Sequence, residues 1–311
     1  GQRDRQTAFL AALVKEPSGD CRRHAERTAG LLEGLGLTVE CHLVSADLVT
    51  EGGMVSVVNL IVRERVDNGP VVALNAHRDV VPPGAGWSKD PNGAEIVNGW
   101  SYGCGVAVSK SDFATYTWAL LALKDLGVPL SGSVELHFTY DEETGGGIGP
   151  AWLLDRGLSR PDYAIGAGFS YGIVTAHNGC LHLEVEMRGR SAHAAKPFTG
   201  IDALEAAAHV LNTLYAWRRT LTRRVSSFEA IGSPQLTVGL IEGAARTFPD
   251  VVVGIRRVPI VLFGAGPRTI EDANAHRADE RLCLTDLYKA TEAAALALLD
   301  FLSNSQQQNS I

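Results

Sequence analysis

The sequence predicts an α/β fold, a mixed β-sheet covered by helices, with a small α+β domain inserted into it. Three observations carry this prediction. Apolar β-rich runs alternate with long helical patterns over 1–178. A run with strict polar–apolar alternation, 181–187, then changes the character of the chain. An apolar run returns at 260–263, so we expect a first domain of 1–178 and 259–311 and an inserted domain of 179–258.

Most elements of the first domain follow from local patterns. Residues 6–35 predict two helices, broken at Pro17-Ser18-Gly19-Asp20 and stopped by Gly34 and Gly36. Val71–Ala76 is almost continuously apolar, which is typical of a strand buried on both faces. The other expected elements are, in chain order, strand 55–62, helix 112–126, strand 134–139, helix 151–156, strand 163–165, strand 260–263 and helix 282–302.

The inserted domain is expected to be a sheet with one solvated face and one helical cover. The alternation over 181–187 predicts a half-buried strand. Residues 202–218 predict an amphipathic helix, and 235–241 and 251–255 predict further strands. This mixture is typical of a small α+β domain.

Composition excludes several classes of protein. Hydrophobic residues make up 45% of the 311 residues, so the chain has enough apolar surface for a core and is not disordered over most of its length. The net charge of −7 argues against a general nucleic-acid binder, which is usually basic. The longest apolar run, 113–123, is too short to span a bilayer. We therefore expect no nucleic-acid and no membrane partner.

The cysteines and the N-terminal residues predict a location. The 5 cysteines are scattered and form no Cys-x-x-Cys pair, which argues against a disulfide framework or a cysteine-based zinc site. The N-terminal residues 1–5 carry charge but no apolar signal region, so no signal peptide is visible. A reducing cytoplasm is the expected location.

A histidine and a carboxylate directly follow the buried strand 71–76. His77 and Asp79 are two residues apart, so in an extended chain their side chains point to the same side. Ligands often bind just past the carboxyl ends of such strands. A carboxylate beside a histidine fixes the tautomer that a metal ligand needs. The pair therefore indicates a metal site, and the alternative is a capped turn with a solvated His–Asp pair.

Three carboxylates, Asp141-Glu142-Glu143, follow strand 134–139 and precede a glycine turn. Adjacent side chains diverge, so Glu142 and Glu143 can serve different partners. One can bind a cation while the other moves the proton of a metal-bound water. The alternative is an acidic surface loop.

Two further histidines lie in predicted loops. His276 lies between strand 260–263 and the closing helix, a place that can bring it to the same edge of the sheet. His193 lies between the strand and the helix of the inserted domain, where it can donate to a developing oxyanion. Taken singly, each is more simply a turn histidine. A reactive thiol at Cys104 is a further hypothesis, although no partner for it is indicated.

Together and in this order, these segments resemble the zinc-dependent exopeptidases and deacylases related to aminoacylase, acetylornithine deacetylase, succinyl-diaminopimelate desuccinylase and carboxypeptidase G. The shared marks are His-x-Asp-Val-Val-Pro at 77–82, Trp87, Asp90-Pro91, Asn98-Gly99, Tyr102-Gly103-x-Gly105, Lys110, the turn 141–146, the segment ending at His193, and His276. The resemblance implies a catalytic domain with a metal-bearing sheet and an inserted lid domain. Against the family pattern, roughly a helix and one or two strands are missing after residue 257. The lid, 179–258, is therefore expected to be either naturally shortened or incomplete in this sequence.

The resemblance also implies a metal centre and a reaction. His77 is implied to bind one zinc ion, with Asp79 as its orienting partner, and Glu143 and His276 to bind the other. The implied reaction is amide hydrolysis, in which metal-activated water attacks a polarised carbonyl.

Two catalytic roles follow from the same resemblance. Glu142 is implied to be the general base. His193 is implied to be the lid histidine that stabilises the tetrahedral oxyanion, typically across a homodimer.

The sequence departs from the family pattern at two acidic positions. Val108 stands where an aspartate usually bridges both metals, and Gly168 where another acidic ligand is expected. Asp112, one helical turn after Val108, can supply a carboxylate if the helix starts differently. Either two zinc ions bind with its help, or the three remaining ligands hold one ion, an ordinary arrangement for catalytic zinc. Cobalt or manganese would also suit such ligands.

The leading prediction is a cytoplasmic zinc-dependent metallopeptidase or amidohydrolase that cleaves an amide bond of a peptide or N-acyl amino acid. It is expected to form a homodimer through the lid. The alternative is a catalytically impaired relative that acts as a small-molecule-binding protein. Arg78 favours a substrate carboxylate if its side chain points into the cleft.

Overall fold

The structure, a computed structural model, falls into two compact units. The first is Gly1–Thr175 with Asp250–Ile311, and the second is Ala176–Pro249. The domain boundaries expected from the sequence, near 179 and 258, stay a prediction. The residues described are 1–17, 21–127, 130–168, 172–173, 183, 185–190, 192–193, 195–227, 232–238, 260–262 and 269–308.

A six-stranded mixed sheet forms the centre of the first unit, in the order β1-β2-β6-β3-β7-β8. β2 runs antiparallel to β1 and β6, whereas β6, β3, β7 and β8 run parallel to one another. The strands are β1 (Val39–Leu43), β2 (Val58–Arg65), β3 (Val71–His77), β6 (Ser133–Thr139), β7 (Tyr163–Gly166) and β8 (Ile260–Leu262). The predicted mixed α/β sheet is confirmed, and β8 returns the chain to it.

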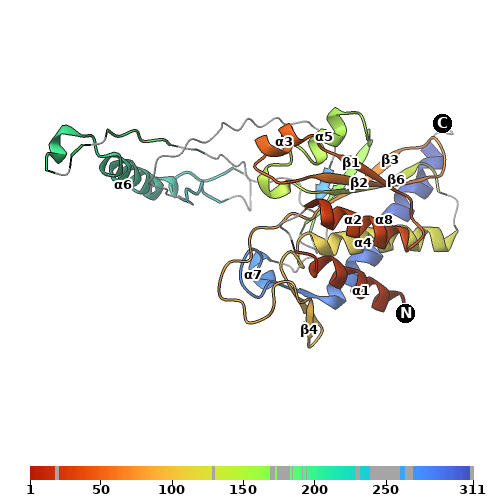
Figure 1. The fold of residues 1–311 in the computed structure, drawn as a ribbon. Coiled ribbons are helices and arrows are strands. Elements are labelled where there is room, and N and C mark those ends of the chain that lie inside the picture. The colour runs from red at the N-terminus through yellow and green to blue at the C-terminus, as the bar shows by residue number, and fades with distance from the viewer. Residues whose placement is uncertain are drawn as a thin grey trace. The chain divides into compact units, whose positions relative to one another are not determined.

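Helices gather on one side of this sheet (Figure 1): α1 (Gln2–Val14), α2 (Cys21–Glu33), α4 (Lys110–Leu126) and α8 (Leu284–Gln308). α4 packs against β3 and β6, and the residues of its first three turns are buried. Phe113 of α4 stacks on Phe138 of β6, with ring centroids 4.1 Å apart. The helix stops where Gly127 takes the left-handed conformation, with φ 59°. Shorter helices are α3 (Ala46–Glu51), α5 (Pro150–Asp155) and α7 (Ile270–Ala273).

A smaller sheet in the same unit has the order β4-β5-β9. Its strands are β4 (Glu95–Val97), β5 (Trp100–Tyr102) and β9 (Arg281–Cys283). Sequence patterns do not predict this sheet, because three-residue strands are too short to show periodicity. The β4–β5 hairpin turns at Asn98 and Gly99, with φ 51° and 80°, the conformation that Asn-Gly favours. β9 replaces the start of the expected closing helix.

The second unit contains α6 (Ala203–Leu221). Asp202 begins this helix by accepting the backbone N–H groups of Leu204 at 2.8 Å and Glu205 at 3.2 Å. The predicted strands are wrong for the residues described, since 183, 185–187 and 235–238 lie in no strand. A strand needs a hydrogen-bonded neighbour, and here none is formed within the described part of the chain. The strand predicted at 251–255 lies outside the described residues.

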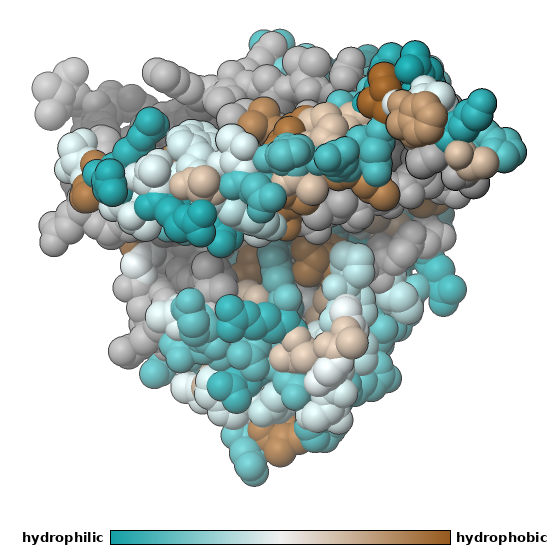
Figure 2. Space-filling view, turned by 90° about the vertical axis from the view of Figure 1, so that its left-hand side faces the viewer, coloured by the Kyte–Doolittle hydropathy of each residue, from teal (hydrophilic) through white to brown (hydrophobic). Residues whose placement is uncertain are grey.

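The surface is mixed in character. Hydrophilic and hydrophobic residues are interspersed on the face drawn in Figure 2. Among the described helices, none is both long and apolar enough to cross a bilayer.

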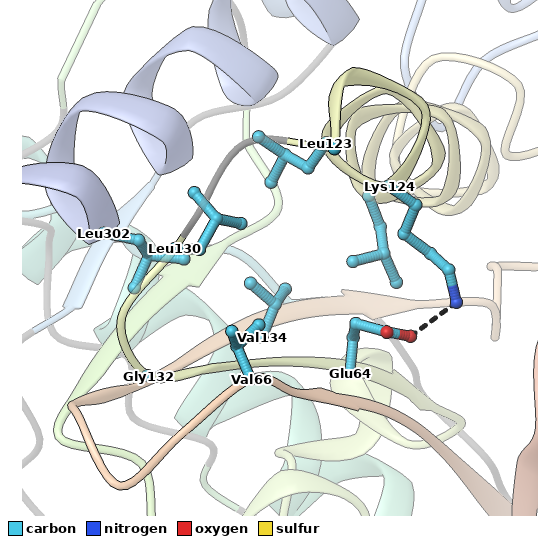
Figure 3. Close-up of a pocket in the computed structure, with 10 residues that line it drawn as sticks. Glu64, Val66, Leu123, Lys124, Leu130, Gly132, Val134 and Leu302 are labelled. Carbon is cyan, nitrogen blue, oxygen red and sulfur yellow. Dashed lines mark hydrogen bonds and ion pairs between the residues drawn. The ribbon is translucent and has the colours of Figure 1, made fainter.

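A hollow of about 200 Å³ opens beside the amino end of β6 (Figure 3). Its side chains are mostly aliphatic, and an ion pair between Lys124 and Glu64, 2.6 Å apart, lies on its wall. Gly132 and Val134 line it. Because β6 runs from Ser133 to Thr139, this hollow and the residues that follow β6 lie at opposite ends of the strand.

Candidate metal and catalytic site

Two neighbouring parallel strands bring the first two motifs together. His77 is the last residue of β3 and pairs with Thr139, the last residue of β6. Glu142 and Glu143 follow at once in a short 3₁₀ helix, Glu142–Thr144. Since parallel strands end at the same edge of a sheet, the imidazole and both carboxylates meet there.

Asp79 connects these two motifs. Its Oδ1 lies 3.5 Å from His77 Nδ1, and its Oδ2 accepts the backbone N–H of Glu143 at 2.8 Å. The His77 Nδ1 also lies 3.1 Å from the Asp79 carbonyl oxygen. Both side chains are buried. The contacts fix the His77 ring, so that its Nε2 faces the acidic turn, 3.7 Å from Glu142 Oε2.

His77, Glu142 and Glu143 can hold a metal ion. Each offers one donor atom, and these atoms all lie within 4.8 Å of one another. An imidazole nitrogen with carboxylate oxygens is a donor set that zinc takes, and manganese and cobalt also accept it. Glu143 is mostly buried, with 19% of its side chain exposed, whereas Glu142 is 60% exposed. The donor chemistry therefore fits a divalent cation, and Glu142 is the more accessible of the two carboxylates.

His276 reaches Glu143 from far along the chain, although it is not in the donor group of His77, Glu142 and Glu143. Its Nε2 lies 3.0 Å from Glu143 Oε1, and about half of the ring is exposed. The turn that carries it has left-handed φ at three non-glycine residues, Asn274, His276 and Asp279. This backbone places the imidazole at the rim of the site.

The charges of the acidic turn act on both histidines. Burial alone would lower the pKa of His77, but the hydrogen bond and charge of Asp79, with the charges of Glu142 and Glu143, raise it to about 9. The hydrogen bond that the His276 ring donates to the Glu143 carboxylate raises the pKa of His276 as well, against the effect of burial. The site thus attracts positive charge, whether a proton or a metal ion.

Two residues that the sequence analysis did not identify, Ser109 and Glu280, support the site by binding backbone N–H groups next to it. The Ser109 hydroxyl accepts the backbone N–H of His77 at 3.0 Å. The Glu280 carboxylate accepts the backbone N–H groups of Gly105 at 3.1 Å and Ala107 at 3.0 Å. Glu280 follows His276 by four residues, and that proximity was the one available signal.

The remaining metal candidates lie elsewhere. Asp112 is fully buried in the first turn of α4, and it does not belong to the group of donors formed by His77, Glu142 and Glu143. Its role as a ligand stays a prediction. Val108 and Gly168 have no metal-binding side chain, although the family pattern has carboxylates at these two positions.

The structure does not support a reactive thiol at Cys104 or a substrate-binding guanidinium at Arg78. Burial raises the pKa of the Cys104 thiol, which opposes a reactive thiolate. Arg78 is fully buried and donates to the carbonyl oxygens of Glu16 and Pro17, both at 2.8 Å. It therefore ties the loop after α1 to the end of β3, and its guanidinium is not available to a substrate carboxylate.

His193 belongs to the second unit. It is exposed, and its Nδ1 accepts the backbone N–H of Ala195 at 3.2 Å. Its expected part in stabilising an oxyanion stays a prediction.

Comparison with known proteins places the chain among peptidases and desuccinylases. Residues 73–300 match the model of peptidase family M20/M25/M40. The chain is 29% identical over 237 residues to a succinyl-diaminopimelate desuccinylase of Gluconobacter oxydans, covering 73% of this chain and 59% of the relative. It is 31% identical over 205 residues to the desuccinylase of Rhodospirillum centenum, covering 61% and 50%. The chain thus spans about half to three fifths of the length of these curated relatives.

Two solved structures share the fold. Aminopeptidase PepT of Bacillus cereus has a TM-score of 0.58 at 18% identity, covering 96% of this chain and 99% of that one. A tripeptidase of Staphylococcus aureus has the same TM-score at 14% identity, covering 96% and 98%. Because the family model matches most of the chain and includes the segments that carry His77, Glu142, Glu143 and His276, the chain belongs to peptidase family M20/M25/M40.

Proposed function

We propose that this chain is a metal-dependent hydrolase that cleaves an amide bond of a peptide or an N-acyl amino acid. One observation carries the proposal: His77, Glu142 and Glu143 converge at the carboxyl edge of the sheet with donor atoms within 4.8 Å of one another. The named activities of the relatives, desuccinylase and peptidase, are all hydrolyses of such a bond.

In this proposal two members of that donor group, His77 and Glu143, hold the metal together with His276, whose Nε2 lies 3.0 Å from Glu143 Oε1, and Glu142 stays free for proton transfer. Zinc is the ion proposed, with cobalt and manganese as substitutes, since imidazole and carboxylate suit all three. A bound divalent ion would supply Lewis-acid polarisation of the scissile carbonyl.

The chain's own residues divide the remaining work. Asp79 holds the His77 ring in one orientation and fixes the backbone of Glu143. Glu142 is exposed beside them, so it can accept a proton from the attacking water and deliver it to the leaving amine. His193 is proposed to donate a hydrogen bond to the developing oxyanion.

The decisive test is hydrolysis by the metal-loaded full chain. N-succinyl-diaminopimelate and a tripeptide are chosen as substrates because a desuccinylase and a tripeptidase are similar to the chain. A set of N-acetyl amino acids tests the N-acyl part of the proposal. Glu142→Gln should lower kcat by about 10²- to 10⁴-fold while metal content stays the same. Glu271→Gln, which removes an exposed carboxylate from α7, is the matched control.

Two outcomes would reject the proposal. Equal turnover by the wild type and Glu142→Gln would remove Glu142 as the base. Metal binding without turnover of any substrate in the set would leave a protein that binds but does not hydrolyse.

The proposal includes an assembly and a location. We propose a homodimer formed through the second unit, in the cytoplasm. Sedimentation equilibrium of the full chain checks the first, since a single species at the monomer mass would reject it. Cell fractionation checks the second.

A further inference from the structure

A buried carboxylate ties together the two chain segments that carry the site histidines. Glu280 lies directly before β9, and it is 3% exposed. Its two carboxylate oxygens accept the backbone N–H groups of Gly105 and Ala107, and its carbonyl oxygen accepts that of Gly103 at 3.0 Å. Three backbone donors of one loop, 103–107, therefore bind a single residue 175 positions further along from Gly105.

The far end of the same loop holds His77. Ser109 accepts the backbone N–H of His77 through its hydroxyl. In between, Gly105 has φ +71° and packs so tightly that a Cβ there would collide with Val80 Cγ1, beside Asp79. The loop thus contacts the end of β3 at two points, and a shift of the loop would move His77.

The near end of the Glu280 segment carries His276. Asp279 fastens the outer side of this turn, since its carboxylate accepts the backbone N–H and the hydroxyl of Ser88 at 2.9 and 2.8 Å. Glu280 fastens the inner side. The turn that carries His276 is therefore fastened by the half-buried Asp279 and the buried Glu280, and of these two carboxylates only Glu280 bonds the loop that leads to Ser109 and His77.

We propose that Glu280 is a positioning residue that sets the spacing between His276 and His77, and so tunes the affinity and geometry of the metal site. This rests on the proposed function in one respect, that both imidazoles are metal ligands. A carboxylate is needed because only its ionised form offers two acceptor oxygens. Glutamine would keep one acceptor and turn an NH₂ group toward the second backbone N–H.

The first test compares Glu280→Gln with Glu271→Gln in full-length protein. We expect Glu280→Gln to weaken Co²⁺ binding by about 10- to 100-fold, as loss of an outer-shell partner does. The visible absorption of the Co²⁺-loaded protein should change toward that of His276→Ala, because the same ligand is displaced. The control should match the wild type in both. A Glu280→Gln protein that unfolds more easily, yet shows the wild-type Co²⁺ affinity and spectrum, would overturn the proposal.

A double-mutant cycle tests the route. If Glu280 acts through loop 103–107, Ser109→Ala and Glu280→Gln both loosen the same connection between the two histidines. The combined loss of Co²⁺ affinity should then be smaller than the product of the two separate losses. Independent, multiplying losses would contradict that route.

A metal-free measurement separates this inference from the proposed function. In the NMR spectrum of histidine-labelled apoprotein, Glu280→Gln should shift the ring signals of both His276 and His77, and Glu271→Gln should leave them in place. If the wild type bound no Co²⁺, but Glu280→Gln still shifted both ring signals relative to the wild type, the metal function would be rejected and the positioning role would remain. Unmoved ring signals would reject the positioning role itself.

Discussion

Asp79 accepts the backbone N–H of Glu143 at 2.8 Å, while its other carboxylate oxygen lies 3.5 Å from His77 Nδ1. One side chain therefore fixes both the ring that ends β3 and the turn that follows β6. The two motifs are far apart in sequence, and this carboxylate makes them one site.

Asp79→Asn should weaken zinc binding by about 10- to 100-fold without unfolding the protein. The amide can still accept from Glu143, but it presents a donor or a neutral oxygen to His77 and no longer fixes the ring nitrogen that faces the metal. Competition with a chelating dye measures the affinity. Asp47→Asn, at an exposed position of α3, is the control, and an unaltered affinity in Asp79→Asn would contradict the role given to it.

His276→Ala should reduce the zinc affinity and leave the thermal stability of the metal-free protein nearly unchanged. The ring is half exposed, so little packing is lost, whereas an imidazole ligand disappears. Isothermal titration and thermal unfolding separate the two quantities. His209→Ala removes an exposed histidine of α6 for comparison. If both variants bound zinc equally well, His276 would be no ligand.

The contribution of His24 to the free energy of unfolding should fall as the pH drops below about 6.5. This ring is fully buried; its Nε2 faces the Leu13 carbonyl at 3.3 Å, and its Nδ1 faces the Thr28 hydroxyl at 3.1 Å. Burial, and then the charges of Arg78 and Lys110, hold its pKa well below the ordinary value, while its hydrogen bond to Leu13 opposes them weakly. Below pH 6.5 the imidazole of His24 is protonated in the unfolded chain but stays neutral in the folded chain. This difference lowers the free energy of unfolding by up to about 1.4 kcal/mol for each pH unit.

Urea unfolding of the metal-free protein between pH 8 and 5, with and without His24→Gln, isolates this effect. Other groups titrate in the opposite sense, among them His77 and Asp141. The raised pKa of His77, about 9, adds stability as the pH falls toward 6.5. Burial raises the pKa of Asp141 to about 6, which adds stability at lower pH. The difference between the two proteins cancels these shared contributions, and a difference that does not depend on pH would refute the assignment to His24.

Phe113→Ala should cost about 3–5 kcal/mol of unfolding free energy, because the ring is fully buried against Phe138 and its loss leaves a cavity under the sheet. Phe198→Ala, at a residue 82% exposed, should change stability by less than about 0.5 kcal/mol. Denaturant titration of both variants checks the contrast. Equal losses would mean that the α4–β6 contact is not part of the stabilising core.

The family pattern made much of the site predictable. His77, Glu142 and Glu143 were identified because each motif directly follows a strand whose apolar run is legible in the sequence, and parallel strands end at one edge. The helix α4 and its stop at Gly127 were predictable for the same local reason. The short strands β4, β5 and β9 were not, since three residues carry no period.

By itself, the sequence determined most of the longer strands and helices of the first unit and the residues that follow them, because hydrophobic periodicity, glycine stops and capping residues act over a few neighbouring positions. The strand β1 and the short elements α3 and α7 were not predicted, like β4, β5 and β9. Only the tertiary structure decided that Ser109 binds the backbone of His77, that Glu280 binds the loop before α4, and that Arg78 points inward. These contacts join segments that are distant along the chain. Strand pairing, burial and the need to satisfy buried backbone donors determine them, and local sequence encodes none of these directly.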